Sequence, residues 1–196
     1  MKSTSNPRTM FLTYQDQHKP IQANNMNIAI DAYQKSFRTL QGQTLALADK
    51  AKAHTALTTK HNKILSLFAE EANEIKKAQL KIEGEIDSAI GLQSNDIHLI
   101  PLMAGKSVKD LVESAKVSPA VGRLLLSDSG KLLGITQGQA DSVLSSLASD
   151  QLQELESLGK RMDMLTTVDS GFMEAGKDIA SFELSATEQA QLNALI

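Results

Sequence analysis

Apolar and small residues recur at alternating steps of three and four over a long stretch without proline, residues 26–90. Such heptad spacing is typical of α-helices that pack along one continuous seam. The pattern therefore predicts a long helix, and the expected interaction seam on it consists of Phe37, Leu40, Leu47, Leu65, Phe68, Ile75 and Ile82.

An unbroken helix over 26–90 would be roughly 95 Å long at 1.5 Å per residue, which exceeds the size of a compact domain of this length. Such a helix must either break or project beyond the compact part of the fold. Residues 54–60 are the candidate break, because His54 and His61 flank several β-branched threonines that lower helix propensity. A turn there would give a helical hairpin of 26–53 and 62–90. No glycine or proline marks it, which favours the unbroken helix, and Gly42 is a lesser weak point.

A second heptad pattern begins at Thr136 and continues toward the C-terminus. Gly171 and Gly176 are expected to end or bend this helix, and Ser185 is expected to cap a short terminal helix over 186–195. The seam of the second pattern consists of Leu144, Leu147, Leu155, Leu158, Met162 and Leu165.

The segment between the two patterns, residues 91–138, contains six of the eleven glycines and two of the four prolines. It is expected to fold as a compact insertion of short helices and loops. Ser107 and Pro119 predict helices over 108–116 and 119–126. The apolar run 96–105 predicts a short strand or a buried connector, and 127–134 predicts a loop.

Residues 1–27 are polar and contain two prolines, which predicts a flexible tail without regular structure. An uncleaved export signal is the alternative interpretation of this tail. The remainder, residues 28–196, is expected to form a single helical domain, divided into a long helix or hairpin (28–90), the central insertion (91–138) and C-terminal helices (139–196).

Composition supports an all-α fold class, in which the two long helices form a coiled coil or elongated bundle around the central segment. Aromatic residues make up only 4% of the chain and tryptophan is absent, so the apolar set consists mostly of helix-seam residues. The chain has no cysteine, which excludes disulfides and thiolate chemistry. No apolar run is long enough to span a bilayer or to form a cleavable signal peptide.

The charge is distributed unevenly although the net charge is only −3. Residues 1–63 carry nine Lys and Arg against three Asp and Glu, whereas residues 139–196 carry three against ten. This asymmetry favours pairing of the two ends within one chain, and assembly between chains is the alternative.

The sequence contains none of the constellations that mark an enzyme. The P-loop, nucleophile-elbow, zinc-protease and EF-hand patterns all fail, so no catalytic residue, metal ligand or cofactor is expected. The carboxylates of Glu70, Glu71 and Glu74 are interpreted as a solvated helix face. His54 and His61 lie two turns apart, too far to share one metal ion, but a protonation switch on the seam is conceivable.

The basic residues between 35 and 63 lack interleaved aromatic residues, so nucleic acid is not an expected partner. Membrane contact through residues 97–103 is possible but not favoured. The expected partners are the chain itself, another helical protein, or both.

The order of a polar start, a long heptad helix, a variable middle and a second heptad helix resembles the layout of bacterial type III secretion needle-tip and filament proteins. The resemblance lies in this layout and not in a sequence motif. With the two heptad seams and the uneven charge, it favours a non-enzymatic structural protein that acts through coiled-coil helix packing and self-assembles. The expected location is outside the cell, after secretion without a cleavable signal peptide, or the cytoplasm. The alternative is a bacterial effector or toxin-like helical protein that binds a host protein or membrane.

Overall fold

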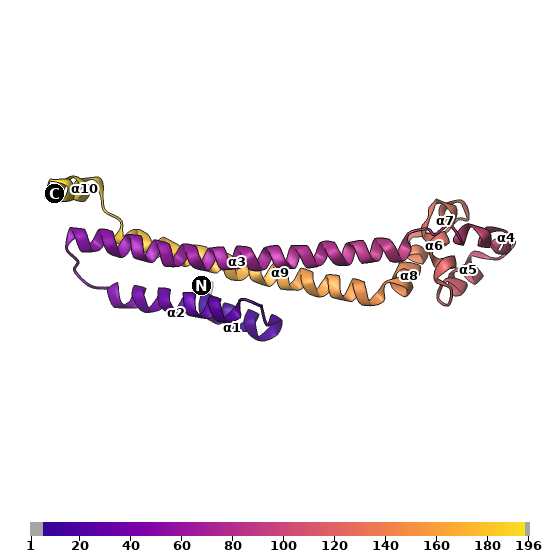
Figure 1. Ribbon diagram of the computed structural model, residues 1–196, viewed down its shortest axis with the longest axis horizontal. Coiled ribbons are helices and arrows are strands. Elements are labelled where there is room, and N and C mark those ends of the chain that lie inside the picture. The colour runs from indigo at the N-terminus through magenta and orange to yellow at the C-terminus, as the bar shows by residue number, and fades with distance from the viewer. Residues whose placement is uncertain (1–5, 195–196) are drawn as a thin grey trace. The chain divides into compact units, whose positions relative to one another are not determined.

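The computed structural model describes residues 6–194, and within this range the chain is all α-helical, with no strand (Figure 1). The predicted fold class is thus confirmed at the level of an all-α protein. The described residues divide between two compact units. Unit 1 comprises 6–75 and 160–194, and unit 2 comprises 76–159. The prediction of a single domain over 28–196 stays a prediction.

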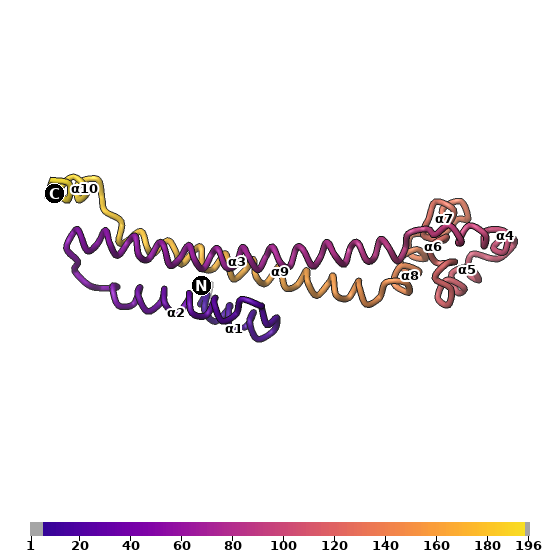
Figure 2. Tube along the Cα trace, viewed as in Figure 1, coloured from indigo at the N-terminus to yellow at the C-terminus, as the bar shows by residue number. Residues whose placement is uncertain are grey.

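Unit 1 is built from helices of both chain ends. It contains α1 (Pro7–His18), α2 (Ala23–Leu40), the first part of α3 (Leu47–Ile90), the last part of α9 (Ser149–Gly176), the 3₁₀ helix η2 (Lys177–Phe182) and α10 (Ala186–Asn193). Figure 2 traces α1 and α2 running beside the unit 1 portions of α3 and α9.

The expectation that residues 1–27 lack regular structure is wrong for helix α1. The side chain of Asn6 accepts a hydrogen bond from the Arg8 amide, and Pro7 occupies the first turn, where its missing N–H costs nothing. Phe11 and Tyr14, three residues apart, are both fully buried. Polar composition concealed this short apolar face. Residues 1–5 of the predicted tail lie outside the described residues.

The long heptad stretch breaks at residues 41–46, so neither the unbroken helix nor the hairpin with a turn at 54–60 is correct. Gly42 has a φ of 79°, a left-handed conformation that glycine adopts without steric cost. Residues 54–60 remain helical because Leu57 is buried in the core. Thr55 and Thr59 also donate hydroxyl hydrogen bonds to carbonyls four residues earlier, at 3.1 and 2.9 Å.

An aromatic cluster forms the centre of the unit 1 core. The ring centroid of Phe68 lies 5.9 Å from that of Phe11 and 5.4 Å from that of Phe172. These rings come from α3, α1 and α9, so each of the three helices contributes to one packed contact. The surrounding buried positions include Met26, Ile30, Leu57, Ile64, Leu165 and Val168.

Helix α10 buries no residue and is held by polar contacts. Ser185 and Glu188 form a capping box at its start. The Lys50 ammonium pairs with Glu188 at 2.9 Å, which joins the basic start of the chain to its acidic end. The Ser185 amide and Lys50 lower the pKa of Glu188 to about 2. The terminal helix was predicted over 186–195, and residue 195 lies outside the described range.

Unit 2 surrounds two small apolar cores with short helices. It contains η1 (Asp96–Leu99), α4 (Ile100–Met103), α5 (Val108–Ala115), α6 (Pro119–Leu126), α7 (Asp128–Leu132) and α8 (Gln137–Leu147), together with the end of α3 and the start of α9. The main core comprises Met103, Leu111, Ala115, Leu124, Leu125 and Val143. A second cluster comprises Ile82 and Ile86, near the end of α3, and Ala148, which lies between α8 and α9.

The two predicted helices after Ser107 and Ser118 are confirmed as α5 and α6. Two other expectations for this segment are wrong. Residues 96–103 form η1 and α4, with Ile97, Ile100 and Leu102 exposed, and not a strand or a buried connector; and α7 interrupts the predicted loop. The second heptad pattern also divides, because Ala148 adopts a non-helical φ of −136° between α8 and α9. Ala148 is fully buried at this bend.

Gly130 is the glycine that unit 2 can least replace. A Cβ atom at Gly130 would lie 1.8 Å from the carbonyl oxygen of Leu125, whereas a Cβ at Gly138 would meet open space. We expect Gly130→Ala to lower the free energy of unfolding of unit 2 by about 2 kcal/mol or more through overpacking against backbone. Gly138→Ala is the matched control and should be neutral or slightly stabilising. Urea unfolding followed by circular dichroism measures both, and equal effects would contradict this packing.

Candidate functional site

The predicted interaction seam lies inside the chain's own packing. Four of its side chains are buried: Phe68, Ile75, Ile82 and Leu165. The other nine are partly covered: Phe37, Leu40, Leu47, Leu65, Leu144, Leu147, Leu155, Leu158 and Met162. In this structure the seam therefore serves intramolecular packing, and a role toward a partner stays a prediction.

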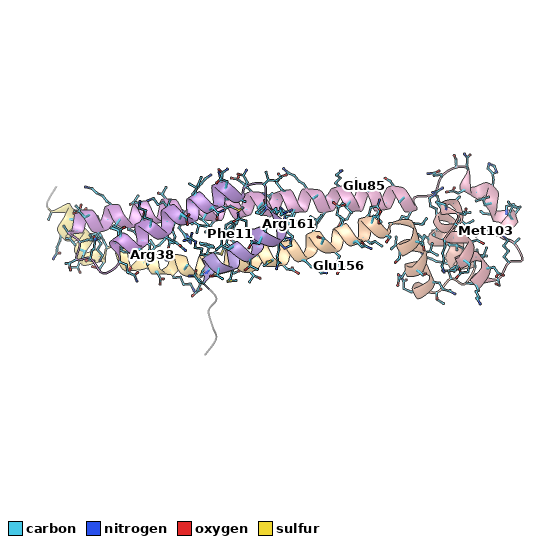
Figure 3. All side chains as sticks on the ribbon, turned by 90° about the horizontal axis from the view of Figure 1, so that it is seen from below. Phe11, Arg38, Glu85, Met103, Glu156 and Arg161 are labelled. Atoms are coloured by element: carbon cyan, nitrogen blue, oxygen red, sulfur yellow. The ribbon has the colours of Figure 1, made fainter. Side chains whose placement is uncertain are left out.

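A carboxylate that the sequence placed on a solvated face is instead at the centre of unit 1. Glu71 is only 1% exposed. The Tyr14 hydroxyl donates to Glu71 Oε1 at 3.0 Å. The Arg161 guanidinium donates to the same oxygen, and its Nε donates to the Tyr14 oxygen at 3.3 Å. Arg161, labelled in Figure 3, comes from α9, so the cluster joins α1, α3 and α9.

Burial is the main electrostatic effect in this Tyr14–Glu71–Arg161 cluster. It raises the pKa of Tyr14 to about 12, and the neighbouring Glu71 charge adds to the rise while Arg161 opposes it. Burial together with the Arg161 charge lowers the pKa of His18, whose ring centroid is 5.2 Å from that of Tyr14. The cluster is therefore organised to keep the phenol neutral while the carboxylate is paired with the guanidinium.

The position of Glu71 in the heptad pattern could have revealed its burial. It lies three residues after Phe68 and four before Ile75, both of which are buried seam residues. The neighbouring Ala72 also fits the spacing, because it lies four residues after Phe68 and three before Ile75. A carboxylate on an apolar stripe predicts a cationic partner on a facing helix, although the sequence alone does not identify that partner as Arg161.

The two seam histidines have different surroundings. His61 is buried, and its Nε2 lies 2.8 Å from the Phe172 carbonyl oxygen. Because a carbonyl only accepts hydrogen bonds, Nε2 carries the proton in this contact. A Cβ at Gly176 would lie 2.4 Å from the His61 ring, so only glycine allows this approach. His54 is half-buried elsewhere on α3, and pH sensitivity of either residue stays a prediction.

A surface groove separates α2 from α3 in unit 1. Its volume is about 300 Å³ and its floor is mostly apolar. The lining residues are Asn25, Ile28, Ala29 and Ala32 of α2 together with Lys60, Lys63 and Leu67 of α3. No motif marks this groove, but the spacing of its α2 residues defines a second stripe beside the buried stripe of the same helix.

A second exposed apolar surface lies in unit 2 on η1 and α4, which we call the η1–α4 patch. It comprises Ile97, Ile100 and Leu102, which are 56%, 45% and 66% exposed. The backbone carrying them is fixed at both ends. Arg123 makes two hydrogen bonds of 2.7 and 2.9 Å to Asp96, and Met103 is buried in the unit 2 core.

Across residues 6–194, no group of three or more His, Asp or Glu side chains is arranged to hold a metal ion. None of the helices in the described part of the chain is both long and apolar enough to cross a membrane. Comparisons with protein-family models, curated proteins and solved structures found no match. The surfaces and the buried cluster are therefore the structural basis for a functional proposal.

The tyrosines offer a direct test of the buried cluster. Burial raises the pKa of both tyrosines in the chain, Tyr14 and Tyr33. Each phenol therefore contributes stability that is fully present below about pH 10, its unfolded value, and is lost as pH rises through the folded pKa. We expect the absorbance near 295 nm to show the phenolate transition of the folded chain at higher pH than the transition of the same chain in urea, which should be centred near pH 10. A transition of the folded chain centred near pH 10 would contradict the burial.

Proposed function

We propose that this chain is a non-enzymatic structural and interaction protein that acts through helix packing with further copies of itself or with another helical protein. The observation that carries this proposal is the η1–α4 patch. Exposed apolar groups that lie together on a soluble surface mark interaction sites more often than isolated ones do.

The patch is held outward by folded structure, which supports a role in binding. The Asp96–Arg123 ion pair is nearly buried, with side-chain exposures of 3% and 12%, and the Gln93 amide donates to the same carboxylate at 2.9 Å. Ile97 and Leu102 therefore face solvent from a fixed backbone and not from a frayed end. A preorganised apolar surface loses less conformational entropy on binding than a mobile one.

The finer arrangement also belongs to this proposal. We interpret α3 and α9 as two heptad-patterned helices that form a coiled coil or elongated bundle. In the sequence they flank the short helices of unit 2. By its similarity to the type III secretion needle-tip and filament layout, the proposal extends to a secreted bacterial component that self-assembles. The alternative is an assembly protein located in the cytoplasm.

A bacterial effector or toxin-like role is a second candidate, and the same patch favours it. Isoleucine and leucine side chains on a fixed surface could also enter a lipid interface. The two candidates differ in what covers the patch, so one set of variants distinguishes them.

We expect light scattering after size exclusion to show that the molar mass of the full chain rises with concentration. Ile97→Ser with Leu102→Ser should weaken this association by about tenfold or more, because covering the exposed parts of the two side chains contributes roughly 1.5 kcal/mol or more in total. Leu80→Ser, at another exposed leucine in unit 2, is the matched control and should associate normally.

The proposal would be contradicted if the chain stayed monomeric at all concentrations and also failed to bind another helical protein. Sedimentation with phosphatidylcholine and phosphatidylserine vesicles tests the second candidate. If the monomer binds vesicles and the Ile97→Ser/Leu102→Ser variant does not, the patch serves membrane contact and not assembly.

A further inference from the structure

We propose that the groove between α2 and α3 is a docking site for an amphipathic helix of a partner protein, with small apolar side chains on one stripe and carboxylates on its flank. This inference goes beyond the proposed function, because it concerns unit 1 and commits to the chemistry of the partner. Its success does not depend on the η1–α4 patch.

Helix α2 has two apolar faces, and only one is used within the chain. Met26, Ile30 and Tyr33 are buried against the rest of unit 1. Ile28, on the groove side, is 60% exposed and is accompanied there by Ala29 and Ala32. A helix that needs only one apolar face to join its own core carries the second stripe for another contact.

The dimensions of the groove suit a helix. Asn25 and Ala32 are seven residues apart on α2, which is about 10 Å, or two helical turns. A docked helix would present residues at positions i, i+3, i+4 and i+7 over this length, the usual mode of helix-in-groove recognition. The alanines on the floor leave room for close approach of a backbone.

The positive charge beside the groove favours an occupant with negative charge on its flank. Lys60 and Lys63 line the α3 side, and neither forms an ion pair with another described residue. Lys60 donates instead to the Ser36 hydroxyl.

Three carboxylates of unit 1 are paired with other cations: Asp31 with Arg8, Glu71 with Arg161, and Glu188 with Lys50. Two uncompensated ammonium groups beside an apolar floor fit a helix with carboxylates one turn apart. A nucleic acid would instead require aromatic stacking groups, and the groove lining contains none.

The test uses the full chain and two synthetic helical peptides of 18 residues. One peptide carries leucine and alanine on one stripe with glutamate on the flanks, and the other has lysine at each glutamate position. We expect the acidic peptide to shift the methyl NMR signals of Ile28, Ala29, Ala32 and Leu67, and to bind at least tenfold more tightly than the basic peptide.

Variants link the preference to the groove. Lys60→Glu with Lys63→Glu should reverse the preference in favour of the basic peptide, a gain that a misfolded chain would not show. Ile28→Ser should weaken binding of both peptides. Lys52→Glu and Ile21→Ser, on exposed residues outside the groove lining, are the matched controls and should leave binding unchanged.

Several results would overturn the proposal: no methyl shifts at the groove, equal affinity for the two peptides, or competition by a single-stranded oligonucleotide that depends on the same lysines. Self-association that is lost in the Lys60/Lys63 variant would assign the groove to a second copy instead. The Ile97→Ser/Leu102→Ser variant should retain peptide binding, so this test and that of the proposed function can fail separately.

Discussion

The carboxylate of Glu71 has to be paired where it lies, because an ionised group removed from water is stable only when its charge and hydrogen bonds are satisfied. Its partners, Tyr14 and Arg161, come from α1 and α9. An apolar heptad seam tolerates a slip of one helix along another, since leucine and isoleucine replace each other with little loss. The contact between Glu71 and Arg161 does not tolerate such a slip, and we infer that it sets the alignment of the three helices in unit 1.

That alignment determines which surfaces remain for other molecules. With Phe11, Phe68 and Phe172 packed together, most of the strongly apolar surface of unit 1 is used internally. The remaining stripe of α2 is weaker and flanked by lysines, which suits a partner chosen by charge as well as by apolar contact. Unit 2 is different, because eight of the twelve large apolar side chains that are exposed among the described residues lie in it.

Heptad spacing and capping residues predicted the all-α class and the positions of α5 and α6, because these depend on local periodicity and on single N-cap side chains. The bend at Ala148 and helix α1 were missed, and Gly42 was ranked below residues 54–60 as a break, because the sequence does not show which side chains long-range packing buries. Leu57 in the core kept 54–60 helical despite low propensity, and buried Phe11 and Tyr14 ordered a polar segment. The Glu71–Arg161 pair and the α2–α3 groove join residues far apart in sequence, and a single sequence does not show which of its distant residues meet.

The most direct test of the central claim is a double-mutant cycle on Glu71→Leu and Arg161→Met, measured by urea unfolding, with Glu70→Leu as the exposed neighbouring control. Each single change should lower the free energy of unfolding by about 3 kcal/mol, because it leaves one charge buried and unpaired. The double variant should lose less free energy of unfolding than the sum of the two single losses. Glu70→Leu should change the free energy of unfolding by about 0.5 kcal/mol or less. Additive losses, or a Glu71→Leu variant as stable as the Glu70→Leu control, would contradict the claim that this contact aligns the helices.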